Sequence, residues 1–167
     1  SIIYKKHPEY RFIVPMVNDC RREQFQSQID TLVSPLPITL YDGQSSAVLQ
    51  AADMVMLASG TAALEAMLAK APMVVAYKVK ALTYMIAKSL SNIEFTSLPN
   101  LIAGKEVVKE LNQDNCTVDK IVAELERLIE HDGQKMIDTF TELHQLIRCD
   151  ADSKAAEEVI KLLNRDN

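Results

Sequence analysis

The chain lacks the features that would assign it at once to a nucleic-acid-binding or membrane-spanning class. It has no basic surplus, because 18 Lys and Arg stand against 23 Asp and Glu and give a net charge of −5. A protein without excess cations has no general attraction for a phosphate backbone, so we expect no nucleic-acid partner. No run reaches the roughly 18 apolar residues of a membrane span, and no signal peptide is visible.

Cysteine is also scarce. Cys20, Cys116 and Cys149 lie far apart, and no two of them form a CxxC pair. This spacing predicts reduced thiols of a cytosolic protein, and it predicts neither a disulfide framework nor a zinc site.

Three glycine-based signatures are absent as well. The sequence contains no GxGxxG and no GxxxxGK[ST], which mark dinucleotide and P-loop sites, and no GxSxG nucleophile elbow. Any nucleotide site in this chain must therefore use another kind of strand-to-helix turn.

The chain does contain a composition typical of one soluble globular domain, with 167 residues, 48% hydrophobic and 25% charged. Short apolar runs alternate with segments of helical periodicity, which predicts an α/β fold with a Rossmann-like parallel sheet and helices on both faces. Pro15 is hard to place in a central strand of that sheet. The predicted strands are residues 11–17, 36–41, 54–58, 73–77 and 94–99. The predicted helices are residues 21–33, 44–52, 61–69, 81–90, 105–111, 117–130, 134–148 and 151–163, with a loop at 100–104 and a break at Gly133.

The first residues look like the end of a helix that Pro8 stops, and no Met precedes them. We therefore expect the chain to be a fragment of a longer protein.

The turn Ser59-Gly60-Thr61 lies between an apolar run and a helix of small residues. Such a turn presents free backbone N–H groups and the positive end of the helix dipole, which favour an anion. Ser59 could equally be a plain N-cap while Gly60 merely packs, and the tripeptide leaves both interpretations open.

Glu65 is the only charged residue between positions 54 and 69. It shares a helix face with Thr61 and Ala69, beside a predicted core stripe of Leu64, Met67 and Leu68. A carboxylate there can accept both hydroxyls of a ribose, with charge-assisted hydrogen bonds of about 1.5–3 kcal/mol. The alternative is a solvated surface glutamate.

Ligands of open parallel sheets bind beyond the carboxyl ends of the strands. Besides the turn, two segments should reach that edge: Asp42-Gly43 after one strand, and Lys78 with Lys80 after another. The lysines could neutralise a diphosphate or be ordinary exposed loop residues.

Three longer motifs make the sequence recognisable. LASGTAALEAMLAKAPMVVAYKVK at residues 57–80, SLPNLIAGKEVVKEL at 97–111 and ELHQLIRC at 142–149 occur in this order, after VPMVNDCRREQF at 14–25. Together they closely resemble the carboxyl-terminal half of the bacterial lipid-A-disaccharide synthases.

The resemblance implies an inverting glycosyltransferase with two Rossmann-like lobes, of which this chain is the donor-binding lobe. The implied reaction transfers 2,3-diacylglucosamine from UDP to the 6-hydroxyl of 2,3-diacylglucosamine 1-phosphate and releases UDP. It requires no metal and no cofactor. Residues 1–150 would bind the UDP-sugar, and a helix in residues 151–167 would pack on the amino-terminal lobe.

The resemblance also implies roles for individual residues. Glu65 matches the glutamate expected on the ribose hydroxyls, while Ser59, Gly60 and Thr61 match the diphosphate turn. Asn100 of the SLPN motif matches a polar contact near the donor phosphates.

The resemblance has further implications for the uracil, the acceptor and the membrane. Asp42 and Gly43 fall where related enzymes hold the uracil through backbone groups. The lipid monosaccharide phosphate acceptor and the general base belong to an amino-terminal lobe that is missing here, as is the family's Leu-Pro-Gly-Ser-Arg turn, so we expect the chain alone to be inactive. For the whole protein we expect peripheral contact with the cytoplasmic face of the inner membrane, and a homodimer stays open.

Two alternatives remain. The chain could be the donor lobe of another UDP-sugar enzyme, such as an epimerase or a murein-type glycosyltransferase, although the SLPN and ELHQLIRC motifs count against both. It could also be a non-catalytic nucleotide-binding module. Composition does not separate these alternatives.

Overall fold

The computed structural model describes residues 1–79 and 95–163 of the chain. The helix expected at residues 81–90, Lys80, and the first residue of the strand expected at 94–99 lie outside this range. The described elements, in chain order, are α1 (Ile2–Lys6), β1 (Phe12–Met16), α2 (Asp19–Ile29), β2 (Ile38–Asp42), α3 (Ser45–Ala51), β3 (Val55–Leu57), α4 (Thr61–Ala69), β4 (Met73–Tyr77), α6 (Leu98–Ala103), β5 (Lys109–Asn112), η1 (Gln113–Asn115), α7 (Val118–Arg127), η2 (Leu128–Asp132), α8 (Gly133–Ile147) and α9 (Ala151–Leu163).

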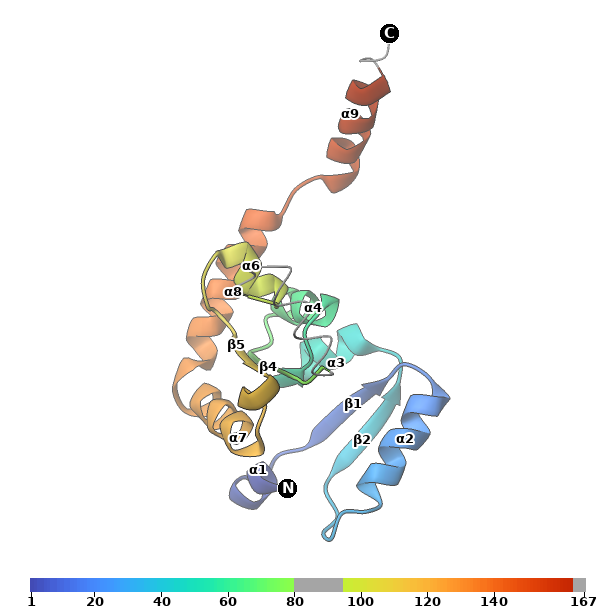
Figure 1. The fold of residues 1–167 in the computed structure, drawn as a ribbon, viewed down its shortest axis with the longest axis vertical. Helices are drawn as coiled ribbons and strands as arrows, with labels where there is room; N and C mark the ends of the chain where they lie inside the picture. The colour runs from blue at the N-terminus through green and yellow to red at the C-terminus, as the bar shows by residue number, and fades with distance from the viewer. Residues whose placement is uncertain (80–94, 164–167) are drawn as a thin grey trace.

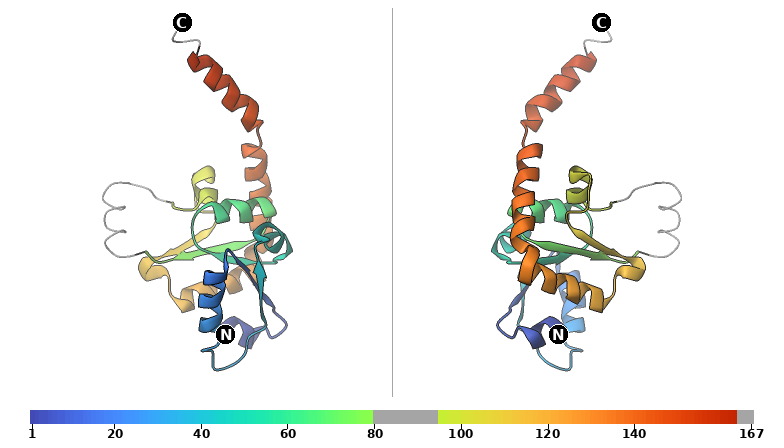
Figure 2. Two further views of the ribbon diagram at one scale, coloured as in Figure 1. Left: turned by 90° about the vertical axis from the view of Figure 1, so that its right-hand side faces the viewer. Right: turned by 90° about the vertical axis from the view of Figure 1, so that its left-hand side faces the viewer.

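The predicted α/β fold with parallel strands is confirmed. β1 pairs with β2 in parallel, and β3, β4 and β5 form a second parallel sheet in that order. Figures 1 and 2 show α4 and α6 on one side of the three-stranded sheet and α7 on the other. The strands are thus divided between two sheets within the described residues.

The hydrogen bonds of β1 explain how a strand accommodates Pro15. The amide of Phe12 donates to Pro37 O at 3.0 Å, and Gly43 N donates to Met16 O at 2.8 Å. Alternate residues of a parallel strand face the same neighbour, so these even-numbered residues face β2. Pro15 therefore turns its nitrogen toward the other edge of β1, which carries no strand in the described chain.

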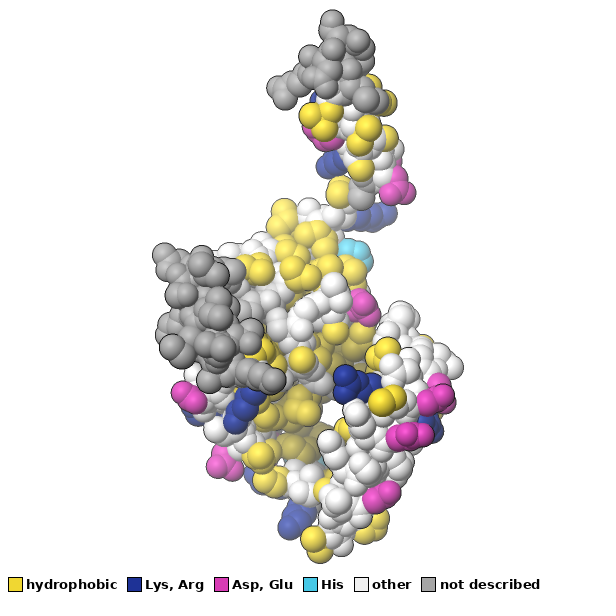
Figure 3. Space-filling view, turned by 45° about the vertical axis from the view of Figure 1, so that its right-hand side comes forward, with side chains coloured by type: hydrophobic (Ala, Val, Ile, Leu, Met, Phe, Trp, Pro, Cys, Tyr) yellow, Lys and Arg dark blue, Asp and Glu magenta, His cyan; other side chains and the backbone are white. Residues whose placement is uncertain are grey.

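Figure 3 shows a recess with hydrophobic side chains between the main body and the part that carries β1, β2 and α2.

The principal core lies between the three-stranded sheet, α4 and α8. Met67, Val74, Val75 and Phe140 have no exposed surface. No residue of β1 or β2 belongs to this cluster. Met16 of β1 is buried, but outside the cluster. The buried members of the cluster are Leu49, Ala63, Ala66, Met67, Met73, Val74, Val75, Val108, Leu111, Leu128, Met136, Phe140 and Leu143.

Three sequence predictions around residues 94–111 are wrong. The segment 95–99 forms no strand, and α6 starts at Leu98 and occupies most of the expected loop. The expected helix at 105–111 contains β5 instead. Val107, Val108 and Leu111 have a spacing that suits a helix, but pairing with β4 makes residues 109–112 a strand. Leu111 is buried within that strand, and Val108 is buried directly before it. Tertiary pairing thus overrides the local pattern.

Gly133 does not separate two helices as expected. The π-helical turn η2 joins α7 directly to α8, and Gly133 is the first residue of α8. A Cβ on Gly133 would lie 2.9 Å from the carbonyl oxygen of Leu128. Glycine is required here for close backbone approach.

The last helix, α9, projects away from the body in every view (Figures 1 and 2). Its residues 152–162 are all exposed, including Val159, Ile160 and Leu162.

Phe140 offers a test of the core. We expect Phe140→Ala to lower the free energy of unfolding by about 3–5 kcal/mol, because it leaves a cavity among fully buried side chains. Leu146→Ala, on the same helix but 71% exposed, is the matched control and should change stability by less than about 0.5 kcal/mol. Urea unfolding measures both, and equal losses would contradict the assignment of the core.

Candidate active site at the carboxyl ends of the strands

The structure places the predicted segments at the carboxyl ends of three strands. Asp42 ends β2, the Ser59-Gly60-Thr61 turn follows β3, and Lys78 follows β4. β3, β4 and β5 are in register through Leu57 and Val75, so their ends share one edge of the sheet.

The turn before α4 leaves the start of that helix uncapped. Gly60 is the N-cap, with φ 131° and ψ −159°, and no side chain caps the helix. This backbone conformation favours glycine, and the space where a Cβ would lie is open to 4 Å. The amide of Ala63 donates to Gly60 O at 3.1 Å, while no side chain caps the amides of Thr61 and Ala62 before it. These two N–H groups have the capacity to bind an anion.

Ser59 is not the N-cap that the plainer interpretation proposed. Its Oγ donates a hydrogen bond of 2.8 Å to the carbonyl oxygen of Thr96. The hydroxyl therefore ties the turn to the segment that precedes α6.

The face of α4 that carries Glu65 points away from the core. Ala63, Ala66 and Met67 are buried, whereas Thr61 and Glu65 are exposed. The predicted core stripe is only partly right, because Leu68 is 39% exposed. Within the described parts of the chain, the Glu65 carboxylate makes no hydrogen bond or ion pair, so its oxygens face solvent on the same side as Thr61.

Asn100 is fully buried and uses its amide within the protein. Oδ1 accepts hydrogen bonds from the amides of Val107 and Val108 at 2.7 and 2.8 Å. Nδ2 donates to Val108 O at 2.8 Å and to Glu110 Oε1 at 2.9 Å. These four bonds exhaust the capacity of a side-chain amide. Asn100 joins the start of α6 to the start of β5, and a direct contact with a ligand would cost one of these bonds.

Glu110 of β5 is a residue that sequence reasoning missed. Its carboxylate accepts from the amide and hydroxyl of both Thr96 and Ser97 and from Asn100. Burial raises the pKa of Glu110, but these hydrogen bonds outweigh it and hold the pKa below its ordinary value. The signal was hidden because residues 105–111 were expected to be a helix, on which Glu110 would be a surface residue.

The other predicted residues are not joined to this network. Asp42 Oδ1 forms an ion pair of 2.5 Å with Arg22 Nη1, and Gly43 has the positive φ of 67° that its turn requires. Lys78 is exposed. In the described ranges, no hydrogen bond connects any of these three to the turn before α4.

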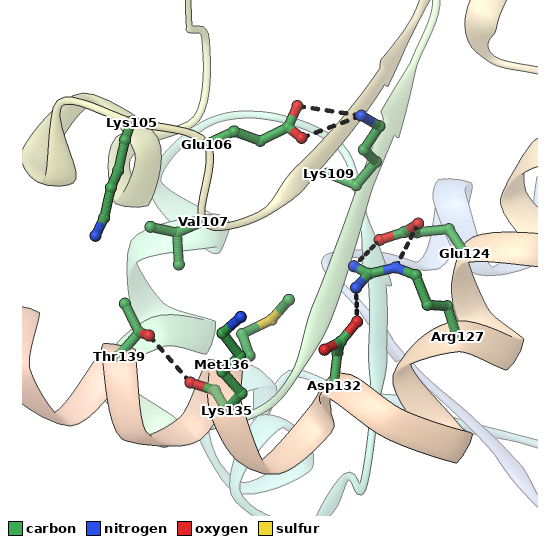
Figure 4. Close-up of a pocket in the computed structure, with 10 residues that line it drawn as sticks. All are labelled: Lys105, Glu106, Val107, Lys109, Glu124, Arg127, Asp132, Lys135, Met136 and Thr139. Carbon is green, nitrogen blue, oxygen red and sulfur yellow. Dashed lines mark hydrogen bonds and ion pairs between the residues drawn. The ribbon is translucent and has the colours of Figure 1, made fainter.

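A pocket of about 570 Å³ lies at the opposite end of the sheet (Figure 4). It is lined by the first residue of β5, Lys109, and by Met136, whose sulfur accepts from the amide of the first residue of β4. Most of its charges are paired internally: Arg127 bridges Glu124 and Asp132, and Lys109 pairs with Glu106 at 3.1 Å. This pocket is therefore separate from the predicted site.

Two features are absent from the described residues. No group of three or more His, Cys, Asp and Glu side chains there could hold a metal ion. No described helix has the length and hydrophobicity of a membrane crossing.

Comparison with known proteins matches the sequence to one family. The model of the lipid-A-disaccharide synthetase family covers residues 2–159. The chain belongs to this family. It is 60% identical over 164 residues to the lipid-A-disaccharide synthase of Psychromonas ingrahamii, a match that covers 98% of this chain and 43% of the relative.

Other relatives bear the same name. The synthases of Aeromonas hydrophila and Vibrio cholerae are 53% and 49% identical over 160 residues, which is 96% of this chain and 42% of each relative. Lipid-A-disaccharide synthases are glycosyltransferases, and this chain spans less than half the length of these relatives.

The lowered pKa of Glu110 predicts a pH dependence of stability. Because the folded-state pKa lies below its ordinary value of 4.5, the carboxylate stabilises the fold above that pH. This contribution is lost as the pH falls through the folded-state pKa.

The free energy of unfolding in urea should therefore fall more steeply on acidification in the parent chain than in Glu110→Gln. Glu106→Gln, at an exposed position just before β5, is the control and should follow the parent. Identical pH profiles for the parent and Glu110→Gln would contradict the assignment.

Proposed function

We propose that this chain is the donor-binding lobe of a lipid-A-disaccharide synthase. The complete enzyme would transfer 2,3-diacylglucosamine from UDP to 2,3-diacylglucosamine 1-phosphate, forming the lipid A disaccharide precursor and releasing UDP. The observation that carries the proposal is the uncapped start of α4 behind Gly60, with the exposed carboxylate of Glu65 on the side of Thr61. Family membership supplies the chemistry that this geometry suits.

The proposed roles follow from the chemistry of each group. The backbone amides behind Gly60, with the hydroxyls of Ser59 and Thr61, would bind the diphosphate of the donor. Glu65 would accept hydrogen bonds from the ribose hydroxyls. Helix dipole and hydroxyl groups would take the place of a metal ion, and no cofactor takes part.

Three further segments have proposed roles in donor binding. Asn100 would act near the phosphates by holding the segment before β5 in place. The backbone of Asp42 and Gly43 would meet the uracil, and Lys78 would add positive charge at the diphosphate.

Two features of the described chain support a lobe that is completed by other segments. The outer edges of β1 and β3 carry no strand, and unpaired edges are normally covered in native proteins. The exposed apolar residues Val159, Ile160 and Leu162 of α9 face no partner within the described residues. We propose that residues 1–150 form the UDP-binding lobe and that α9 packs on an amino-terminal lobe.

The remaining partners belong to the whole protein. The acceptor, a lipid monosaccharide phosphate, would bind the amino-terminal lobe beside the general base. The complete enzyme would act at the cytoplasmic face of the inner membrane by peripheral contact, and α9 could also join two subunits in a homodimer.

An NMR titration with UDP, UMP and ADP tests the site. We expect chemical-shift changes at residues 59–65 and in the segment around Asn100, with UDP preferred. Changes that spare residues 59–65, or an equal response to ADP, would overturn the assignment and favour a general nucleotide-binding module.

The same titration should show the ribose contact. Glu65→Ala should weaken UDP binding by about 1.5–3 kcal/mol, because a charge-assisted hydrogen bond is lost. Glu142→Ala, an exposed helical glutamate of α8, is the matched control and should bind UDP like the parent. Unchanged affinity in Glu65→Ala would make Glu65 an ordinary solvated side chain.

We also expect the 167-residue chain to form no disaccharide from the UDP donor and the monosaccharide phosphate, because the acceptor pocket and general base belong to the other lobe. Mass spectrometry of the products measures this, with a full-length synthase as the positive control. Detectable disaccharide would refute the prediction.

A further inference from the structure

Glu110 lies on an interior row of the sheet. Leu57 of β3 is in register with Val75 of β4, which is in register with Glu110 of β5. Val75 has no exposed surface. Burying an ionised side chain in such a row lowers the stability of the fold unless hydrogen-bond donors surround it. The partners of Glu110 therefore decide whether its charge is tolerated.

In the described chain, the Glu110 carboxylate accepts hydrogen bonds from five donor groups. Oε1 receives Ser97 N at 2.9 Å, Ser97 Oγ at 2.7 Å, Asn100 Nδ2 at 2.9 Å and Thr96 N at 3.1 Å. Oε2 receives Thr96 N at 2.9 Å and the Thr96 hydroxyl. Only a carboxylate presents two acceptor oxygens without a donor, so a glutamine at this position would set an NH₂ group against donors.

The network continues from Glu110 to the turn before α4. Thr96 is held by Glu110 through its amide and hydroxyl, while its carbonyl oxygen accepts from Ser59 Oγ at 2.8 Å. Two residues therefore separate the carboxylate from Gly60, whose backbone opens the proposed anion site.

We propose that Glu110 is a positioning residue for the phosphate-binding turn of the donor site. It holds residues 96–100 in place and, through the Thr96 carbonyl, fixes the Ser59 hydroxyl and the backbone behind it. This inference rests on the proposed function, because it assumes that the turn binds a diphosphate. A pre-organised turn loses less conformational freedom when the ligand binds, and affinity rises accordingly.

The direction in which UDP affinity changes separates a positioning role of Glu110 from a purely electrostatic one. A negative charge near a phosphate site repels the ligand, so removing it would strengthen UDP binding if charge alone mattered. Removing a positioning residue weakens UDP binding instead. Uridine has no phosphate, so its affinity should be unaffected by either change.

The experiment compares the parent chain with Glu110→Gln and with the control Glu106→Gln by NMR. In the ligand-free state, Glu110→Gln should shift the amides of residues 96–100 and also those of residues 59–61. In titrations it should weaken UDP binding by about tenfold, the equivalent of one hydrogen bond, and leave uridine binding within about twofold. Glu106→Gln should match the parent in both arms.

Thr96→Val provides a second variant if Glu110→Gln does not fold. It removes one hydroxyl donor and keeps the backbone bonds of the segment, so it should reproduce the selective loss of UDP affinity at a smaller size. Unchanged or tighter UDP binding, an equal loss for UDP and uridine, or ligand-free shifts confined to residues 96–100 would each overturn the inference. A parent chain that does not bind UDP at residues 59–65 would overturn the proposed function, while the ligand-free comparison would still decide whether Glu110 controls the turn.

Discussion

One carboxylate ties together the segments that meet beside the carboxyl end of β3. Glu110 accepts hydrogen bonds from Thr96, Ser97 and Asn100, and Thr96 in turn accepts the hydroxyl of Ser59. A charge set among buried side chains is tolerated only when donors satisfy it, and here the donors come from a different part of the chain. The start of α6, β5 and the turn before α4 are consequently held in one arrangement.

The two sides of α4 lie in different surroundings. Its small and apolar residues Ala63, Ala66 and Met67 are buried and bring the helix close to the sheet, which fixes the turn at its start. Its other side leaves Thr61 and Glu65 in solvent. A helix that is buried on one side and carries few long side chains on the other leaves room for a ligand without loosening the core.

Burial differs between parts of the described fold. The three-stranded sheet has fully buried residues on β4, whereas β1 and β2 form a separate pair in which most residues are half-buried. The last helix, α9, contributes apolar residues that nothing in the described chain covers. Such surfaces are usually covered in native proteins. The chain spans about 43% of the length of its Psychromonas relative, which agrees with a lobe that functions beside another.

Local patterns in the sequence determined the parallel α/β class and the strands near residues 36–41, 54–58 and 73–77, because apolar runs bounded by Pro and Gly report on burial directly. They also placed Glu65 on the helix face that carries Thr61. They could not determine β5, whose spacing suits either a helix or a strand until β4 selects one. Nor could they reveal that the buried side chain of Asn100 joins α6 to β5 and donates to Glu110. Those roles depend on hydrogen bonds between residues that the sheet brings together. Tertiary structure decided them because a polar side chain takes its role from its neighbours.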